Sequence, residues 1–191
     1  MEVVEIIGYK RANLGKKESK DLRLEASVPC VLYGGSEQIH FHVPMILFRP
    51  LVYSQSVYKV KLNIEGDIYE AVLQATQFHP VSEVMLHADF LLLRSDRKVK
   101  MEVPIRFTGN AIGVSKGGKL QQNLQKVKIK AFPQDLPSHV EVDITNLDLG
   151  KSVRVSDIPD GKFEILNVKS VPIANVSIPR ALKGKEAESS K

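Results

Sequence analysis

Apolar and polar residues alternate with a period of two through much of this 191-residue chain, and no other feature constrains its fold as strongly. In one segment, Ile39, Phe41 and Val43 alternate with two histidines. Such alternation is typical of β-strands that bury one face. The same pattern recurs in residues 58–64, 99–107, 127–131 and 140–144. We therefore predict a mainly β protein.

Turn residues between alternating segments predict two β-hairpins. The sequence Glu65-Gly66-Asp67 separates one strand from the apolar run IYEAVLQATQF, which is expected to return along it. The sequence PQDLPS separates the segments 127–131 and 140–144 in the same way. This second hairpin would place opposite charges across the strand pair, which is the favourable arrangement. The residues concerned are Lys128, Lys130, Glu141 and Asp143.

Helical signals are few. Ser19 is expected to cap a short helix that runs through Leu22 to Ala26. Residues 44–55 also have apolar positions at helical spacing, but Pro50 lies among them. A proline inside a helix costs about 3 kcal/mol, so a helix here either starts at Pro50 or is kinked there.

A polar break, RSDRK at residues 94–98, divides two β-rich halves. We predict domains at residues 1–95 and 96–180 and a disordered tail at residues 181–191, where apolar residues are scarce. There is no apolar run near 18 residues and no leader sequence, so neither a membrane helix nor a secretory signal is expected. The pattern favours a cytoplasmic protein.

Charge is distributed unevenly along the chain. There are 27 Lys and Arg residues and 22 Asp and Glu residues, a net charge of +5. Residues 10–23 hold six of the basic residues and only two acids, whereas the rest of the first half is acidic. A focused basic segment can bind an anion that diffuse charge would not.

The glycines near the N-terminus do not form a nucleotide-binding loop. That loop needs four residues between its glycines and a hydroxyl residue after the lysine, because the hydroxyl holds Mg²⁺. Here six residues separate Gly8 from Gly15, and Lys17 takes the place of the hydroxyl residue.

The histidines do not predict a metal site. His40 and His42 share the solvent side of a predicted strand and have no acidic neighbour. His79, His87 and Asp89 could converge, but His87 and Asp89 lie on one face of a strand and are better explained as a hydrogen-bonded pair. We predict no metal and no cofactor.

The sequence also lacks a nucleophile signature, so no enzyme is predicted. The single cysteine, Cys30, lies in the apolar run VPCVLY and has no partner for an internal disulfide. A buried, inert thiol is the expected state of such a residue.

The basic segment 10–23 is then the strongest functional signal. A charge run is usually a solvated surface. Here Gly15 would let the backbone come close to a ligand, and Tyr33 stands at a strand end before two glycines, where it could stack on a base or bond a sugar. A half-buried core position explains Tyr33 equally well.

Four ordered motifs resemble one family. GKKESKDLR, VPCVLYGG, QFHP and HADFLLL are similar to the bacterial large-subunit ribosomal protein family L-twenty-five, which binds 5S ribosomal RNA. Its two-domain form, also called general stress protein CTC, is matched by VPIRFTGNAIGVSKGGKL and FPQDLPSHVEVDITNLDLGKSVRVSDI. The resemblance covers roughly residues 3–178. It implies a six-stranded antiparallel β-barrel with short helices, followed by a second β-rich domain.

The resemblance also implies an RNA site. Phosphate contacts would come from Lys16, Lys20 and Arg23, and contacts to shape, sugars and base edges from Arg11, Tyr33, Gln77, His87 and Asp89. Asp89 could accept from a base or orient His87. Lys17 stands where the family usually has glycine, and Lys20 where arginine is common.

These implications amount to a non-enzymatic, cytoplasmic protein of the large ribosomal subunit. It would bind an internal loop of 5S ribosomal RNA, contact neighbouring ribosomal proteins and be a monomer off the ribosome. Two other classes stay open from the residues alone. A pocket with converging titratable groups would favour a small-molecule-binding or enzymatic barrel, and a protein–protein module of stress regulation is the third interpretation.

The most basic stretch lies in the second half. Residues 97–130 hold nine Lys and Arg residues against Glu102 alone. Lys116 and Lys119 flank Gly117-Gly118, a pair suited to close approach of phosphate. We predict a second RNA surface formed by Lys98, Lys100, Lys116 and Lys119. Neutralisation by Glu141 and Asp143 is the competing interpretation.

Overall fold

The computed structural model describes residues 1–54, 56–159 and 161–179. The predicted mainly β architecture is confirmed, with a closed barrel in the first part of the chain and further sheets in the second. The described helices include none that is long and apolar enough to span a membrane. The tail predicted at residues 181–191 lies outside the described residues.

The chain divides into two compact units. The first consists of residues 1–99 together with 132–138, and the second of residues 100–131 and those from 139 onward. Because a segment from the second half groups with the first unit, the domain limits predicted at residues 1–95 and 96–180 stay a proposal.

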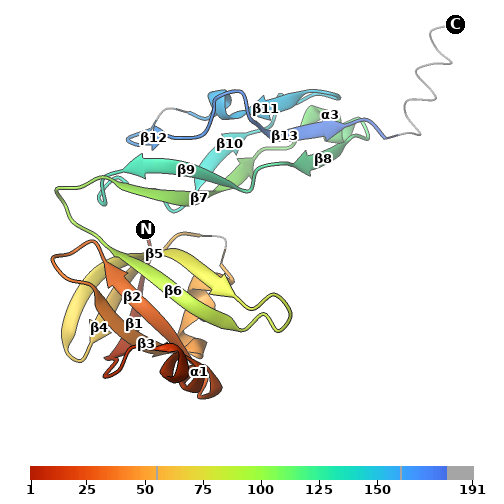
Figure 1. Cartoon of the computed structure of the whole chain (residues 1–191). Helices are drawn as coiled ribbons and strands as arrows, with labels where there is room; N and C mark the ends of the chain where they lie inside the picture. The colour runs from red at the N-terminus through yellow and green to blue at the C-terminus, as the bar shows by residue number, and fades with distance from the viewer. Residues whose placement is uncertain (55, 160, 180–191) are drawn as a thin grey trace, which may run out of the picture. The chain divides into compact units, whose positions relative to one another are not determined.

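The first unit is a closed barrel with the strand order β1-β3-β2-β6-β5-β4 (Figure 1). Its strands are β1 (Val3–Lys10), β2 (Ser27–Tyr33), β3 (Ile39–Pro44), β4 (Lys59–Ile64), β5 (Asp67–Phe78) and β6 (Met85–Leu92). Four neighbouring pairs are antiparallel, as expected. The β1–β4 and β2–β6 pairs are parallel, which corrects the prediction of an antiparallel barrel. Each parallel pair joins strands distant in sequence, so a crossover replaces the tight hairpin.

Alternate residues of these strands fill the barrel interior. The Phe90 ring lies 5.8 Å from the Phe41 ring and 6.1 Å from the Phe48 ring, centroid to centroid. Gly8 is required opposite this cluster, because a Cβ atom there would lie 2.7 Å from the fully buried Phe41 ring. The interior is therefore a packed core.

The short helices of the first unit are α1 (Lys16–Leu24), the 3-10 turn η1 (Met45–Phe48) and α2 (Arg49–Val52). The prediction that Ser19 caps α1 is wrong: the N-cap is Gly15, four residues earlier. The Ser19 hydroxyl instead donates to the Gly15 carbonyl at 2.7 Å. Pro50 lies in the first turn of α2, where its missing N–H costs no hydrogen bond. Of the two alternatives, a helix start near Pro50 is the one found, although α2 begins one residue earlier, at Arg49.

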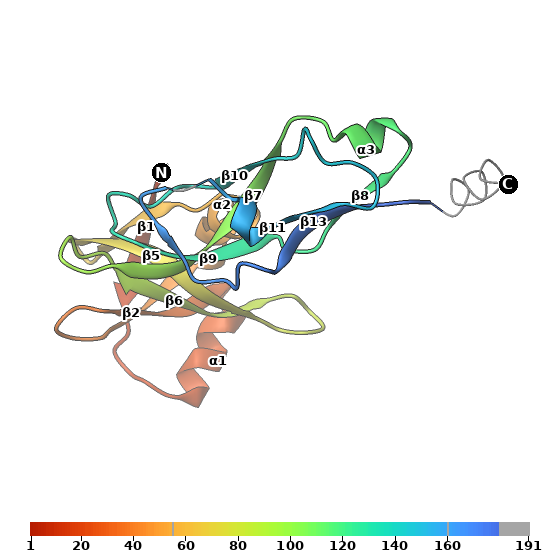
Figure 2. The same ribbon diagram turned by 90° about the horizontal axis from the view of Figure 1, so that it is seen from above.

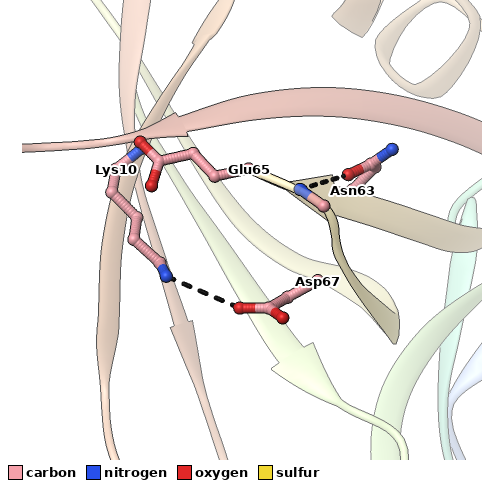
Figure 3. Close-up of polar contacts among 5 residues, drawn as sticks. Lys10, Asn63, Glu65 and Asp67 are labelled. Atoms are coloured by element: carbon pink, nitrogen blue, oxygen red, sulfur yellow. Dashed lines mark hydrogen bonds and ion pairs between the residues drawn. The ribbon is translucent and has the colours of Figure 1, made fainter.

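The predicted β4–β5 hairpin is confirmed, and its turn also ties down β1 (Figure 3). Glu65 and Gly66 have φ angles of +55° and +101°, as a type I′ turn requires. The Glu65 carboxylate accepts a hydrogen bond from the Lys10 N–H at 3.1 Å. Lys10 Nζ lies 3.5 Å from Asp67 Oδ2. These contacts continue the parallel β1–β4 pair past its last paired residues.

The second unit contains two sheets. Their elements are β7 (Val99–Thr108), α3 (Ile112–Ser115), β8 (Lys119–Gln122), β9 (Lys126–Ala131), β10 (Val140–Asp143), β11 (Ser152–Arg154), η2 (Val155–Asp157), β12 (Glu164–Ile165) and β13 (Pro172–Ser177). One sheet has the order β10-β7-β9-β12 and the other β11-β13-β8. Figure 2 shows β13 of the second sheet with β11 and β8 beside it.

The hairpin predicted between residues 127–131 and 140–144 is wrong. In the sheet, β7 lies between β9 and β10, and β10 pairs with β7 in parallel. The physical reason is that residues 132–138 group with the first unit, so they do not connect β9 and β10 as neighbours within one sheet. Lys128 and Lys130 therefore pair with Glu102 and Glu164, both at 3.6 Å, in place of the acids on β10.

The packing at Gly8 predicts a stability effect. Gly8→Ala should lower the free energy of unfolding by roughly 1–3 kcal/mol, because the buried Phe41 ring has no room to move. Gly15→Ser is the matched control, since nothing lies within 4 Å of a Cβ atom there and serine is a favourable N-cap. Urea unfolding followed by circular dichroism measures both, and equal stability of the two variants would contradict the packing account.

Candidate nucleic-acid interface

The basic residues of α1 form a stripe along one side of the helix. Lys16, Lys20 and Arg23 are spaced i, i+4 and i+7, which places them one above another. Lys17 lies roughly 100° further round the axis and falls outside the stripe. Within the described part of the chain, the ammonium groups of Lys16 and Lys20 are exposed and take part in no ion pair. They are free to meet an anion.

Arg23 directs this stripe toward β6. Its Nε donates a hydrogen bond to the Leu86 carbonyl at 3.0 Å, at the start of that strand. Figure 1 shows α1 at the end of the barrel where β2 begins. The remaining guanidinium nitrogens of Arg23 can still donate to a ligand.

The outer surface of β5 and β6 carries three of the predicted site residues side by side. His87 Nδ1 lies 2.7 Å from Asp89 Oδ1, and each side chain is 30% exposed. Gln77 is the register partner of His87 on the neighbouring strand. The pair of His87 and Asp89 predicted from the sequence is present, so Asp89 is placed to orient the imidazole.

Tyr33 ends β2 beside the same strand, with Leu91 of β6 as its register partner. Burial raises the pKa of its phenol, and the negative charge of Asp89 adds to the shift. The phenol therefore stays a neutral donor at physiological pH. The following Gly34 has a φ angle of +97°, a conformation that side chains disfavour.

Arg11 is placed differently from the other predicted site residues. Its side chain is 7% exposed, and its Nη2 donates to the Ser19 hydroxyl at 3.2 Å. Glu18 Oε2 lies 3.8 Å from the same nitrogen. The Arg11 guanidinium thus points toward the first turns of α1. No pattern in the sequence indicates these contacts of Ser19 and Glu18, because Ser19 is expected there to cap the helix.

His79 makes hydrogen bonds of its own, apart from the pair of His87 and Asp89. His79 Nδ1 accepts hydrogen bonds from the N–H groups of Val81 and Ser82, at 3.3 and 3.1 Å, and so serves the β5–β6 turn. His42 packs its ring against Tyr9, with centroids 5.6 Å apart. Among the described residues, no three His, Cys, Asp or Glu side chains are grouped to hold a metal ion.

A shallow groove on the first unit lies away from this interface. It is lined by Ile46, Arg49, Pro50, Tyr53, Ser54 and Tyr58. Among the described lining residues, Arg49 is the one that is charged at neutral pH, and there is no carboxylate or histidine beside it. The groove gives little support to an enzymatic barrel.

Two of the four lysines predicted as a second RNA surface have partners within the protein. Lys98 Nζ lies 5.3 Å from the centre of the Phe132 ring. Lys116 Nζ contacts both carboxylate oxygens of Asp148, at 2.9 and 3.0 Å, and this hydrogen bonding holds the pKa of Asp148 below its usual value. Lys100 and Lys119 are exposed and, among the described residues, have no ionic partner.

The glycine pair between Lys116 and Lys119 has a packing explanation. A Cβ atom at Gly118 would lie 2.4 Å from the Val176 side chain and 2.6 Å from the Gly113 carbonyl. Gly117 has a φ angle of +90°. Both residues are glycine because of the fold of this loop, so the pair is no evidence for a phosphate site.

Comparison with known proteins covers both units. Residues 6–90 match the family described as the Ribosomal L25p family, and residues 98–180 match Ribosomal protein TL5, C-terminal domain. A protein of Cytophaga hutchinsonii named Large ribosomal subunit protein bL25 is 55% identical over 191 residues, the full length of both chains. Proteins of the same name from Amoebophilus asiaticus and Phocaeicola vulgatus are 50% and 40% identical. The alignments cover 98% and 100% of this chain and 96% and 100% of those proteins.

The burial of Cys30 beneath this surface predicts that its thiol is unreactive in the folded protein. Cys30 is 1% exposed, and burial, followed by the charge of Asp89, raises the pKa of its thiol far above the usual value. A chromogenic disulfide reagent should therefore react with it only after unfolding. Asp89→Asn should leave the thiol unreactive, because burial is the larger cause. Rapid labelling of the native protein would contradict this account.

Proposed function

The chain belongs to the ribosomal L25p family in its two-domain form, and we propose that its barrel binds 5S ribosomal RNA. Membership makes it a structural, non-enzymatic protein of the large ribosomal subunit, located on the bacterial ribosome in the cytoplasm. The family places it among ribosomal RNA and other ribosomal proteins; the identity of the RNA is the proposed step.

One observation carries the proposal: the cationic side chains of α1 lie beside a cluster of side chains that can hydrogen-bond a base. The α1 stripe of Lys16, Lys20 and Arg23 is fixed to the start of β6 through the Leu86 carbonyl. The neighbouring strands β2, β5 and β6 offer Tyr33, Gln77, His87 and Asp89. Phosphate contacts position a protein and base contacts give specificity, and both kinds are available on one surface.

The chemistry of this surface favours an irregular RNA helix. A regular A-form helix hides its base edges in a deep, narrow major groove, whereas an internal loop exposes edges and 2′-hydroxyl groups. Tyr33 as a neutral phenol, the Gln77 amide and the His87 imidazole can all bond such groups. Asp89 is an anion and would face the anionic RNA. It acts by orienting His87, since the two side chains are already bonded to each other.

A second contact of the protein with ribosomal RNA rests on fewer residues. Of the four lysines first considered, Lys98 and Lys116 already have partners, and Lys100 and Lys119 remain. We propose these two as a weak, sequence-independent contact. The protein is proposed to be a monomer off the ribosome.

The α1 stripe predicts that two classes of variant weaken RNA binding in different ways. Lys16→Ala or Lys20→Ala should weaken binding to 5S and scrambled RNA alike and lower the salt slope by roughly one unit or slightly less for each lost phosphate contact. Gln77→Ala and Tyr33→Phe should weaken binding to 5S RNA selectively, by about tenfold or less. Titration of fluorescent RNA at several salt concentrations measures both effects.

Lys17→Ala is the matched control, because it removes an equal charge from the same helix outside the stripe. It should change affinity and salt slope less than Lys16→Ala. Equal losses from both variants would show that only the overall charge of α1 matters. An unchanged ratio of 5S to scrambled affinity in the Gln77 and Tyr33 variants would refute their base-reading role.

A fragment of residues 1–95 should fold alone and bind 5S RNA, because the buried cluster of the barrel lies between Ile6 and Phe90. Full-length protein should bind ribosomal particles more tightly than this fragment at low salt, and the advantage should shrink as salt rises. Circular dichroism tests the folding. A ratio of affinities that is flat across salt would reject the contact through Lys100 and Lys119.

A further inference from the structure

We propose that His79 is a positioning residue of the RNA interface, because its imidazole locks the turn between β5 and β6. Through this turn, His79 holds Gln77 beside His87. The same turn leaves the Leu86 carbonyl available to Arg23. The inference rests on the proposed function, because it concerns how that interface is held. It starts from a histidine whose hydrogen bonds lie within one turn of the chain.

The turn is built around the polar groups of one residue. Nδ1 of His79 accepts hydrogen bonds from the N–H groups of Val81 and Ser82, at 3.3 and 3.1 Å. The His79 backbone adds two more: its N–H donates to the Val84 carbonyl at 2.8 Å, and its carbonyl accepts from the Glu83 N–H at 2.9 Å. In this arrangement Nδ1 is an acceptor, so the imidazole is neutral and carries its proton on Nε2.

Hydrophobic packing does not hold this turn. Residues 79–83 are exposed, Val84 is half-buried, and Val81 reaches 86% exposure. Glu83 has a φ angle of +55°, a left-handed conformation that a residue with a side chain adopts at a cost. Polar contacts must therefore fix the turn, and two of its four hydrogen bonds come from the imidazole of His79.

The strands beside the turn change register within the candidate interface. Gln77 pairs with His87, but the next residue, Phe78, pairs with Met85. Leu86 is therefore an extra residue of β6 with no register partner on β5. Such β-bulges re-aim side chains and are common next to functional sites. Here the bulge directly follows the pair of Gln77 and His87.

His79 fixes where this bulge falls. Its N–H donates to the Val84 carbonyl, which continues the register of Phe78 and Met85 into the turn. Without the imidazole bonds, the turn could lengthen by one residue and Phe78 could pair with Leu86. A slip of one residue turns side chains to the other face, so Met85, now 3% exposed, would leave the core. The core contact of Met85 resists this slip, and the bonds of His79 add to that resistance.

The extra residue links the turn to the helix α1. The Leu86 carbonyl accepts a hydrogen bond from Arg23 Nε at 3.0 Å. If Leu86 joined the β5–β6 ladder, it would move away from Arg23, because a slip of one residue shifts a strand by about 3.3 Å. One turn thus supports both parts of the interface, the pair of Gln77 and His87 and the cationic stripe of α1.

Two substitutions separate positioning from a direct contact of the imidazole with RNA. His79→Phe keeps a planar ring and removes the acceptor. His79→Asn keeps an acceptor, because asparagine side chains bond the backbone two residues on in Asx turns, and it removes the Nε2–H that a direct contact would use. Val81→Ala is the matched control, since it removes an exposed side chain of the same turn and none of the hydrogen bonds of His79.

Hydrogen exchange of the full-length protein without RNA tests the lock itself. The amides of Val81 and Ser82 should be protected in wild-type protein, although their side chains are exposed. His79→Phe should speed their exchange by about tenfold, whereas His79→Asn and Val81→Ala should leave it within about threefold of wild type. Exchange in β2 should be unchanged in every variant. Equal rates in wild-type protein and His79→Phe would overturn the proposal.

Binding to 5S RNA gives the second measurement. His79→Phe should weaken it by about tenfold and weaken binding to scrambled RNA less, because the disturbed geometry includes a pair proposed to read bases. His79→Asn and Val81→Ala should bind 5S RNA about as tightly as wild type. Equal losses in His79→Phe and His79→Asn would assign the imidazole a direct contact and overturn the positioning role. An equal loss in Val81→Ala would overturn it too, by assigning the contact to the turn surface.

A double variant tests whether His79 acts through Gln77. His79→Phe and Gln77→Ala together should weaken 5S binding by less than the product of their separate effects, because both changes disturb one contact. A loss equal to that product would reject this route. If wild-type protein bound 5S RNA no better than scrambled RNA, the proposed function would fail, while the exchange rates would still decide whether His79 locks the turn.

Discussion

The parallel pairing of β2 with β6 is the constraint on which the candidate interface depends. These strands are separated by the whole middle of the first unit, yet their register places Val31 beside Asp89 and Tyr33 beside Leu91. The matching parallel pair, β1 with β4, closes the other side of the barrel, and the Lys10 and Glu65 contact continues it. Closure leaves no free edge among the barrel strands, so the outer surface of β6 is held rigidly by neighbours on both sides.

The helix α1 is held by fewer apolar contacts than the strands of this surface. The barrel is held by a continuous apolar core, whereas the helix buries Leu22 and is otherwise held by polar contacts, such as that of Arg23 with the Leu86 carbonyl. A stripe of cations at helical spacing is useful for binding only if the helix has a fixed rotation. The division of roles follows from this difference: the barrel supplies geometry through hydrophobic packing, and the helix supplies charge whose direction is set by polar contacts.

Local patterns in the sequence were enough to predict strands and tight turns, because interactions between residues close in sequence determine these features. Alternation of period two located the strands, and the turn at Glu65-Gly66 was predictable because its conformation depends on those residues alone. The pairing of β10 with β7 was not, since which strands become neighbours depends on distant packing. For the same reason, the sequence alone could not bring Gln77, His87 and Tyr33 together. The family resemblance selected them, and the strand register then placed them side by side.

The number of basic residues alone overestimates how strongly the second unit can bind RNA. Its basic stretch looked stronger than the segment at residues 10–23, but the fold brings acids from other elements to its lysines, such as Glu102 to Lys128 and Asp148 to Lys116. Each exposed pair is worth less than about 1 kcal/mol, so a phosphate could displace the acid. The displaced carboxylate would nevertheless stay close to the phosphate and repel it. A paired lysine therefore contributes less to RNA affinity than the unpaired Lys16 or Lys20, and free cations in a fixed direction are a better guide to the site than net charge.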